Sequence, residues 1–381
     1  MGNDSNLPTI HFVTTYDPAL ENLGGASWVD RRILETLSGT FETIVHSIAN
    51  ERGTDGMVRL ELRASALAKV RTMYRMFAHG EPYFSAKFTS DRNWRSRTAD
   101  IFRQISGGDI VVTSQFPALL ASRLAGLKID AHIAHNVDAV LANRYDPRLF
   151  RLIDNPQRTA RAEIEATLWA DQVWGLSRRD VDLIAGWGVN AYHLPLATGI
   201  GVPTNERRRL IGFLGKGTWP PNYSAIEEMI GEVLPLVRSA LGDAAPTLVL
   251  GGRGTESWRG MPGVKVVGAV ASAADFYRSI DLVAVPRLGE STGISVKMLE
   301  AISNGVPVIV PTALASDAGL NSGFLAGDSS AEIAEQIVKY YSHPGYVESC
   351  ARFPKSSIPA NENGFLLRMK ELADAKGQSH V

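Results

Sequence analysis

The chain has 381 residues, with 39 Lys and Arg against 40 Asp and Glu, so its formal net charge is −1. This length suggests two domains, each able to bury its own core. A near-neutral chain with 45% hydrophobic and 21% charged residues is typical of a globular enzyme and argues against nucleic acid as a partner. The single cysteine, Cys350, excludes an internal disulfide and a cysteine-based metal cluster, which favours a reducing compartment.

The first residues show no targeting pattern, because Met1–Asn6 has neither a basic nor an apolar region. No stretch of the sequence approaches the roughly 18 apolar residues of a membrane span. We therefore expect a cytoplasmic protein that is at most peripheral on the inner face of the membrane.

Short apolar runs alternate with amphipathic helical stretches, which is typical of parallel sheets flanked by helices. The predicted strands cover residues 9–14, 109–112, 131–134, 172–176, 209–214, 246–250, 264–267, 282–285 and 306–310. The main predicted helices cover residues 27–37, 294–304 and 361–376. The expected fold class is α/β, with two Rossmann-like domains.

A stretch rich in Gly, Pro and polar residues at 198–207 is expected to link the two domains. We predict an N-terminal, acceptor-binding domain over residues 1–203 and a C-terminal, nucleotide-sugar-binding domain over 208–355. Residues 356–381 are expected to form a helix that packs back on the first domain. Ligands commonly bind in a cleft between two such domains.

Between Arg52 and Arg97 ten basic residues stand against four acidic ones, with Met, Tyr and Phe residues among them. Such a basic and aromatic stretch suits an anionic membrane surface. A solvated helix face with its apolar side in the core is the alternative.

The segment from Pro286 to Pro311 contains the residues whose chemical role is clearest from the sequence. A Gly/Ser/Thr-rich loop leads into a helix, and the backbone N–H groups of Gly293, Ile294 and Ser295 at the helix start suit a diphosphate. Lys297 and Glu300 lie three residues apart on one helix face, where Lys offers charge to a phosphate and Glu offers acceptors to ribose hydroxyls. An ordinary surface ion pair is the alternative for this pair alone.

The run from Lys297 to Ala301 (KMLEA), followed by Asn304–Ile309 (NGVPVI), resembles the nucleotide-sugar signature of the GT-B glycosyltransferases of family 4. The resemblance extends to further segments in the same order as in that family, at residues 170–180, 211–222, 248–252 and 267–281. It implies a GT-B fold, in which two Rossmann-like domains face a central cleft.

The resemblance also implies roles for single residues. Glu300 would hold the donor ribose, and Lys297 and His135 would be the catalytic residues. Asn136 and Asp138 would lie on the acceptor side of the transferred sugar. The remaining donor-binding residues would be Gly24, Gly25, Gly215, Lys216, Gly252 and Val270, with Gly293, Ile294 and Ser295. A plain turn for Gly24-Gly25, an exposed loop lysine for Lys216 and a structural histidine for His135 are the alternatives.

One departure from the family pattern concerns a second carboxylate. Many members have a Glu eight residues before the ribose-binding Glu, and Thr292 occupies that position here. A P-loop is rejected because Gly217 follows Lys216 where Ser or Thr is required. The Asp180-Val181-Asp182 match lies in a helical pattern, so we do not expect a metal site there.

We therefore expect a hexosyltransferase that moves a sugar from a nucleotide diphosphate sugar to a hydroxyl of a glycan or lipid-linked acceptor, in bacterial glycan or glycolipid synthesis. The resemblance implies retention, and neither a cofactor nor a metal ion is expected. A nucleotide-sugar epimerase of the same fold is one alternative. A catalytically silent partner subunit is the other, and the missing carboxylate gives it some support.

Overall fold

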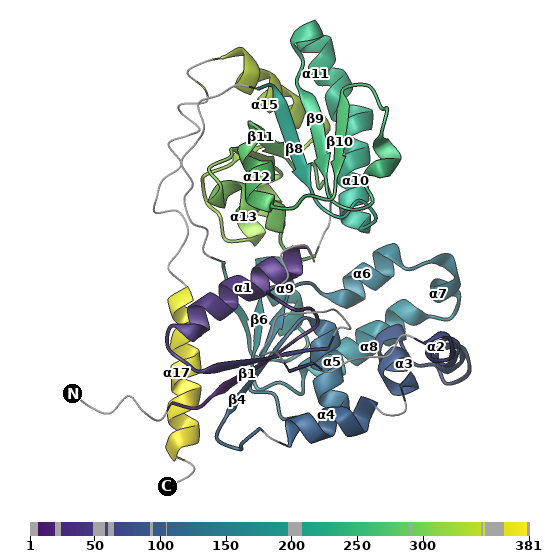
Figure 1. Cartoon of the computed structure of the whole chain (residues 1–381), viewed down its shortest axis with the longest axis vertical. Helices are drawn as coiled ribbons and strands as arrows, with labels where there is room; N and C mark the ends of the chain where they lie inside the picture. Colours follow the sequence, from purple (N-terminus) through teal and green to yellow (C-terminus); the bar gives the residue numbers. More distant parts are fainter. Residues whose placement is uncertain are drawn as a thin grey trace, which may run out of the picture. The chain divides into compact units, whose positions relative to one another are not determined.

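The computed structural model describes residues 7–19, 24–48, 58–59, 65–91, 94–103, 105–196, 208–289, 292–343, 346 and 362–378. The chain forms two compact units (Figure 1). The first consists of Met1–Leu196 and Ala360–Val381, and the second of Ala197–Pro359. The stretch at 198–207, expected to be a linker, lies outside the described residues.

The first unit is built on a seven-stranded parallel sheet with the order β3-β2-β1-β4-β5-β6-β7. Its strands are β1 (Ile10–Thr14), β2 (Thr43–Ser47), β3 (Val58–Arg59), β4 (Ile110–Ser114), β5 (Ala131–Ala134), β6 (Val173–Gly175) and β7 (Ala191–His193). Its helices are α1 (Gly25–Ser38), α2 (Ala66–Ala78), α3 (Tyr83–Ser90), α4 (Trp94–Phe102), α5 (Phe116–Leu124), α6 (Asp138–Tyr145), α7 (Arg148–Leu152), α8 (Asn155–Thr167), α9 (Arg178–Ala185) and α17 (Glu362–Gln378).

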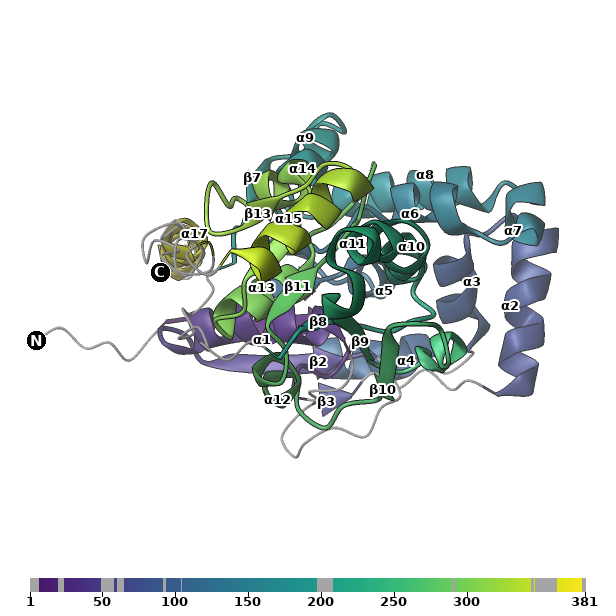
Figure 2. The ribbon, with the colours of Figure 1, turned by 90° about the horizontal axis from the view of Figure 1, so that it is seen from above.

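The second unit is built on a six-stranded parallel sheet with the order β10-β9-β8-β11-β12-β13. Its strands are β8 (Leu210–Leu214), β9 (Thr247–Gly251), β10 (Val264–Gly268), β11 (Leu282–Ala284), β12 (Val308–Val310) and β13 (Leu325–Ala326). Its helices are α10 (Pro220–Glu228), α11 (Leu234–Leu241), α12 (Ala273–Arg278), α13 (Val296–Ser303), α14 (Thr312–Asp317) and α15 (Ser330–Ser342), with short helical turns at η2 (Met229–Val233), η3 (Gly242–Ala244) and η4 (Glu256–Trp258). In Figure 2 α11 and α15 lie side by side, and the two helices are in contact.

In both sheets the chain begins at a central strand, β1 or β8. It first adds strands on one side of that strand and then returns to add strands on the other side. Right-handed crossovers then place the helices of one winding direction on one face of the sheet and those of the other direction on the opposite face. The α/β prediction of two parallel sheets is confirmed, and strands of fully buried residues such as β1 and β4 form the core of the first unit.

Local sequence signals account for several helix starts. The side chains of Ser177, Ser272 and Ser329 each accept a hydrogen bond from the backbone N–H three residues later, where Asp or Glu stands. This pairing satisfies donors that a helix start leaves without partners, and an acidic residue there suits the helix dipole.

The structure differs from the sequence expectations at short elements. Strands β2, β3, β7 and β13 were not predicted, because each is short or interrupted by polar residues such as His46. The helix expected at 294–304 begins at Val296, because Ser295 has an extended backbone and serves as its N-cap.

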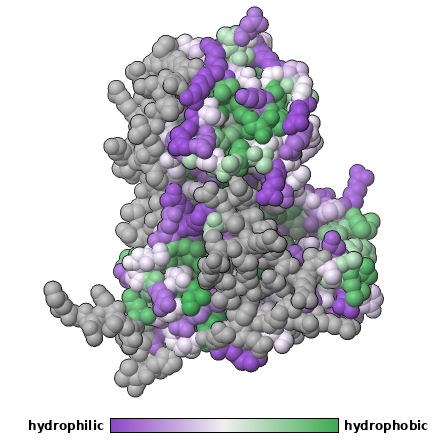
Figure 3. Space-filling view, in the orientation of Figure 1, coloured by the Kyte–Doolittle hydropathy of each residue, from purple (hydrophilic) through white to green (hydrophobic). Residues whose placement is uncertain are grey.

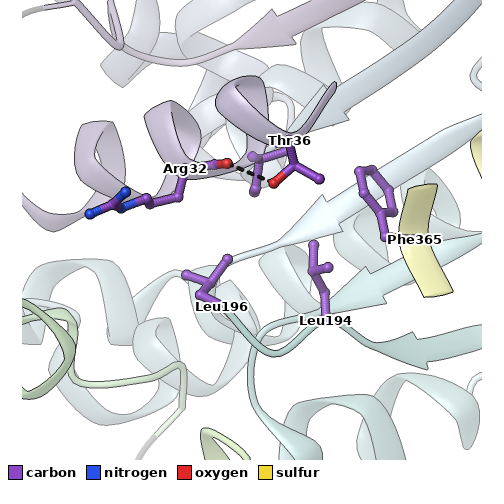
Figure 4. A pocket seen from close by; sticks show the side chains of 6 residues that line it. Arg32, Thr36, Leu194, Leu196 and Phe365 are labelled. Atoms are coloured by element: carbon purple, nitrogen blue, oxygen red, sulfur yellow. Dashed lines mark hydrogen bonds between the residues drawn. The ribbon is translucent and has the colours of Figure 1, made fainter. Parts of the chain in front are cut away.

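The C-terminal helix α17 belongs to the first unit and contacts α1. Phe365 of α17 is buried and meets the ring of Trp174 edge-on, with ring centroids 5.1 Å apart. A small, mostly apolar pocket marks this junction of α1, the segment after β7 and α17, and Figure 4 shows Phe365 beside Leu194 there.

Candidate active site

The second sheet changes its winding direction between β8 and β11, and ligands of such sheets bind outside the carboxyl ends of the strands at this point. The residues that gather there come from the ends of β8 and β11 and from α10, α12 and α13. We call them the Lys297 cluster, and its members are Phe213, Asn222, Tyr277, Arg287, Lys297 and Glu300.

Lys297 lies in the first turn of α13. Its Nζ donates a hydrogen bond to Asn222 Oδ1 at 2.8 Å and lies 4.9 Å from the centre of the Phe213 ring. Burial, reinforced by the positive charge of Arg287, lowers the pKa of Lys297 to about 8, against the opposing effect of Glu300. A cation held in a partly desolvated place interacts more strongly with a nearby anion than one in water does.

Glu300 lies one turn further along α13. Its Oε2 accepts a hydrogen bond from the hydroxyl of Tyr277 at 3.0 Å, and Tyr277 is fully buried. Burial and the neighbouring Glu300 raise the pKa of Tyr277 well above its usual value, so this hydroxyl stays a donor. Tyr277 therefore fixes one oxygen of the carboxylate.

Two glycines let backbone segments meet beside Lys297. A side chain at Gly215 would place its Cβ 2.7 Å from Asn222 Nδ2 and 3.4 Å from Lys297 Cε. Gly252 has φ of +113°, and a Cβ there would lie 2.1 Å from the carbonyl oxygen of Gly215. A larger residue at Gly252 would displace the backbone of Gly215, and one at Gly215 would displace the side chain of Asn222.

The loop before α13 is anchored to the end of β11. Arg287 donates a hydrogen bond to the carbonyl of Thr292 at 2.6 Å, and Thr292 is buried. Gly293 has φ of +69°, and Ile294 and Ser295 are buried where the loop enters the helix. The Ser295 hydroxyl is buried and has no hydrogen-bond partner among the described residues, as expected at a helix start shaped for an anion.

The other two predicted donor-binding residues of this unit, Lys216 and Val270, do not belong to the Lys297 cluster. The side chain of Lys216 is exposed, whereas its carbonyl accepts a hydrogen bond from Asn222 Nδ2 at 3.0 Å. Val270 follows β10 and is half-buried. Neither side chain takes part in the Lys297 cluster.

The first unit carries a buried polar network at the matching edge of its sheet, which we call the Asp30 network. Asp30 in α1 is fully buried and accepts hydrogen bonds from Thr14 at 2.6 Å, Ser114 at 2.6 Å and Gln115 at 3.0 Å. His135, directly after β5, places Nε2 2.9 Å from Ser114 Oγ and 3.2 Å from Asp30 Oδ1.

Gln115 reaches Asp30 from an unusual backbone conformation. Its φ is +72°, in the left-handed region that costs a residue with a side chain roughly 1–3 kcal/mol. This φ occurs at the turn from β4 into α5, where Gln115 is the N-cap. The surrounding network therefore holds a strained residue in place.

The remaining predicted site residues of the first unit lie in loops and at the starts of helices. Gly24 has φ of +102° and is the N-cap of α1, whose first residue is Gly25, and no atom lies within 4 Å of where a Cβ at Gly24 would stand. Asn136 is half-buried in the loop after His135. Asp138 is the first residue of α6, whose N-terminal N–H groups donate to the buried Glu163.

Sequence reasoning missed Asp30, although a signal was present. Asp30, Ile33 and Leu37 share one helix face, so a charged residue occupies a core position of α1. Arg287 was missed as well, although it lies in the segment from Pro286 to Pro311 that carries the predicted donor-binding residues. Asn222 and Tyr277 were noticed only as parts of longer matching segments.

Among the described residues, no group of three or more His, Cys, Asp or Glu side chains is arranged to hold a metal ion. Asp180 and Asp182 lie in helix α9, as the sequence pattern predicted. No helix in the described part of the chain is long and apolar enough to cross a membrane.

Residues 208–343 match the family described as Glycosyl transferases group 1. Solved structures resemble the whole chain. A UDP-forming α,α-trehalose-phosphate synthase from Burkholderia xenovorans aligns with a TM-score of 0.63 at 12% identity, covering 96% of this chain and 100% of that one. The chain has the GT-B fold.

Two further structures share the GT-B fold. Anabaena HepE, in complex with UDP and glucose, aligns with a TM-score of 0.57 at 13% identity, covering 98% of this chain and 99% of that one. WaaG, a glycosyltransferase involved in lipopolysaccharide biosynthesis, aligns with a TM-score of 0.59 at 14% identity, covering 96% and 99%. No curated protein matches the chain by sequence. The expected resemblance and the GT-B fold are thereby confirmed, and the second unit is the part that matches the family.

Proposed function

We propose that this protein is a retaining glycosyltransferase that moves a hexosyl group from a nucleotide diphosphate sugar to a hydroxyl of a glycan or lipid-linked acceptor in bacterial glycan or glycolipid synthesis. The Lys297 cluster supports the proposal best. It joins a half-buried cation, a helix start with a buried hydroxyl and a fixed carboxylate within two turns of α13.

Each part of the cluster suits one part of the donor. The β-phosphate becomes more negative as the sugar leaves, and Lys297 with the N–H groups at the α13 start would stabilise that charge without a metal ion. Glu300, oriented by Tyr277, would accept hydrogen bonds from the ribose hydroxyls. HepE is described in complexes with UDP and with UDP-glucose, so UDP-sugars are the first donors to test.

A panel of nucleotide sugars with and without acceptor glycans tests the reaction class. Nucleotide release that needs an acceptor, with retained configuration in the product, supports the proposal. A changed sugar without an acceptor would indicate an epimerase. Binding without any turnover across the panel would favour the silent subunit, for which Thr292 in place of the first carboxylate is the specific observation.

The donor site is tested separately with Glu300→Gln. Because hydrogen bonds to a charged group contribute about 1.5–3 kcal/mol, we expect UDP affinity to fall roughly tenfold to hundredfold. The amide oxygen still accepts from Tyr277, so thermal stability should change little. Titration calorimetry with UDP, using the exposed Glu256→Gln as a control, measures the effect, and an unchanged Kd would remove Glu300 from the ribose site.

We also propose that the enzyme works at an anionic membrane, through an exposed apolar face of α2. Leu67, Val70, Tyr74 and Phe77 fall on one side of this helix and are each about half exposed or more, at 57%, 65%, 61% and 47%. Only Thr72 and Met76 of α2 are buried. An apolar helix face left in water favours insertion at the boundary of a bilayer.

The charge of the same region favours an anionic surface over a protein groove. Helix α2 carries Lys69, Arg71 and Arg75 and no acidic residue. The short helix α7 adds two arginines and exposes Leu149 and Leu152 by 50% and 83%. Figure 3 shows hydrophobic side chains gathered at this edge of the first unit.

Sedimentation with vesicles tests the membrane proposal. We expect binding to anionic vesicles that weakens with salt and is lost in Val70→Ser/Tyr74→Ser and in Lys69→Gln/Arg71→Gln, since each cation near the surface contributes about 1 kcal/mol. Arg75 is a poor choice because it pairs with Glu81, and Arg92 lies outside the described residues. Arg259→Gln/Lys265→Gln, exposed in the second unit, is the charge-matched control. No binding, or equal binding to neutral vesicles, would contradict the proposal.

A further inference from the structure

The carboxylate of Asp30 is used only as a hydrogen-bond acceptor. Its Oδ2 accepts from Thr14 Oγ1 at 2.6 Å and from Gln115 Nε2 at 3.0 Å, and its Oδ1 accepts from Ser114 Oγ at 2.6 Å. These donors come from the ends of β1 and β4, and Asp30 itself is fully buried. A buried carboxylate with this many donors has a fixed position and orientation.

The position of the Ser114 hydroxyl proton determines which atom donates in the contact between Ser114 and His135. A serine hydroxyl has one proton, and that of Ser114 points to Asp30 Oδ1. Ser114 Oγ also lies 2.9 Å from His135 Nε2, so in this contact Oγ accepts and Nε2 donates. Asp30 Oδ1, 3.2 Å from the same Nε2, favours a proton there as well.

The other ring nitrogen of His135 then carries the lone pair. A neutral imidazole has one N–H, so a proton on Nε2 leaves Nδ1 as an acceptor. Nδ1 has no hydrogen-bond partner among the described residues, and the ring follows directly after β5 at the carboxyl edge of the sheet. This is the edge where parallel α/β sheets bind ligands.

We propose that Asp30, acting through Ser114, holds His135 with its proton on Nε2, so that Nδ1 accepts a hydrogen bond from a hydroxyl of the sugar substrate. Asp30 and Ser114 are positioning residues in this arrangement, and of these three residues His135 is the one that contacts the sugar. The substrate part of the inference rests on the proposed transferase function, whereas the protonation pattern is a property of the free protein.

The wild-type protein provides the first measurement. In protein labelled with 15N-histidine, long-range 1H–15N spectra distinguish a protonated from an unprotonated ring nitrogen, and His135→Gln identifies the signals of this ring. At neutral pH we expect a protonated Nε2 and an unprotonated Nδ1. A proton on Nδ1, or on both nitrogens, overturns the proposal even if transfer activity is found.

Asp30→Asn tests the positioning role. The new amide can donate a hydrogen bond to Ser114, and the proton of Ser114 can then point at His135 Nε2. We therefore expect the ring to shift toward the form with its proton on Nδ1. A comparable Asp→Asn change in the serine-protease triad selects the wrong tautomer. We expect kcat to fall roughly tenfold to hundredfold with a smaller change in KM, because the acceptor at Nδ1 is lost. An unchanged ring spectrum in folded Asp30→Asn overturns the proposal.

Thr14→Val is the matched control. It removes a hydrogen bond to Asp30 of the same 2.6 Å length but leaves Ser114 and His135 in contact. The ring signals of His135 should then stay as in the wild type. A Thr14→Val protein that shows the same tautomer change as Asp30→Asn would mean that general damage to the network causes the effect, and this too overturns the proposal.

Discussion

Lys297 shows how one half-buried side chain can be prepared for an anion before any ligand is bound. Its ammonium group rests on the Phe213 ring and on one amide oxygen, which is less solvation than water provides. This desolvation is the main reason why its pKa falls to about 8. A phosphate that arrives beside it would supply the missing counter-charge and raise the pKa again.

We therefore expect Lys297→Ala to lower kcat by roughly 10²–10³-fold, the range found when one donor to a developing anion is removed. Donor affinity should fall less, since the charge contributes most when the phosphate becomes more negative. Steady-state kinetics and nucleotide titration measure the two effects, with Lys265→Ala, an exposed lysine of the same unit, as control. Unchanged turnover would remove Lys297 from the mechanism.

At the scale of elements, the start of α6 is capped by a buried carboxylate from another helix. Glu163 of α8 accepts hydrogen bonds from the backbone N–H groups of Asp138 and Ala139 at 2.8 and 2.6 Å. Burial raises the pKa of Asp138 to about 7, and burial together with the neighbouring Asp138 raises the pKa of Glu163. The two acids therefore bind protons more readily than free carboxyl groups do, and the two hydrogen bonds of Glu163 fix the start of α6, which follows the loop carrying His135.

Because folding raises the pKa of Asp138, this site holds more protons in the native state than in the unfolded chain between about pH 4 and 7. The contribution of Asp138 to stability is full below its unfolded pKa and is lost as pH rises through about 7. We expect Asp138→Asn to flatten this decline by an amount on the order of 1–3 kcal/mol, measured by denaturant unfolding across pH. Asp182→Asn, an exposed position of α9, is the control and should keep the wild-type slope.

At the scale of the molecule, the chain returns to its first unit after completing the second. Helix α17 contributes Phe365 to the surroundings of Trp174, and Lys376 Nζ donates to the buried Asp130 at 2.8 Å and to the carbonyl of Asp109. Asp130 in turn accepts from the backbone N–H of Val111 in β4 at 2.8 Å. Phe365 and Lys376 of α17 thus add contacts to the first unit.

Phe365→Ala should lower the free energy of unfolding of the first unit by roughly 3–5 kcal/mol, the usual effect of removing a buried phenylalanine. Leu367→Ala, on the exposed side of the same helix at 58% exposure, should change it by less than about 0.5 kcal/mol. Chemical denaturation followed by tryptophan fluorescence checks both. Equal effects of the two substitutions would show that α17 does not support the core.

The sequence by itself determined the features that depend on neighbours along the chain. Residues 110–112 and 282–284 lie in strands because their apolar residues are continuous, and Ser177, Ser272 and Ser329 cap helices within three residues. Lys297 and Glu300 share a helix face through spacing alone. The two-sheet α/β fold follows from the alternation of these elements.

Only the tertiary structure decided the surroundings of the reactive groups. Strand order, which is set by non-local pairing, brings Thr14, Asp30, Ser114, Gln115 and His135 to one edge although more than a hundred residues separate the first from the last. The lowered pKa of Lys297 depends in the same way on Phe213 and Asn222 from other elements. Desolvation and the satisfaction of hydrogen bonds depend on which distant residues pack around a group, so no local sequence pattern predicts them.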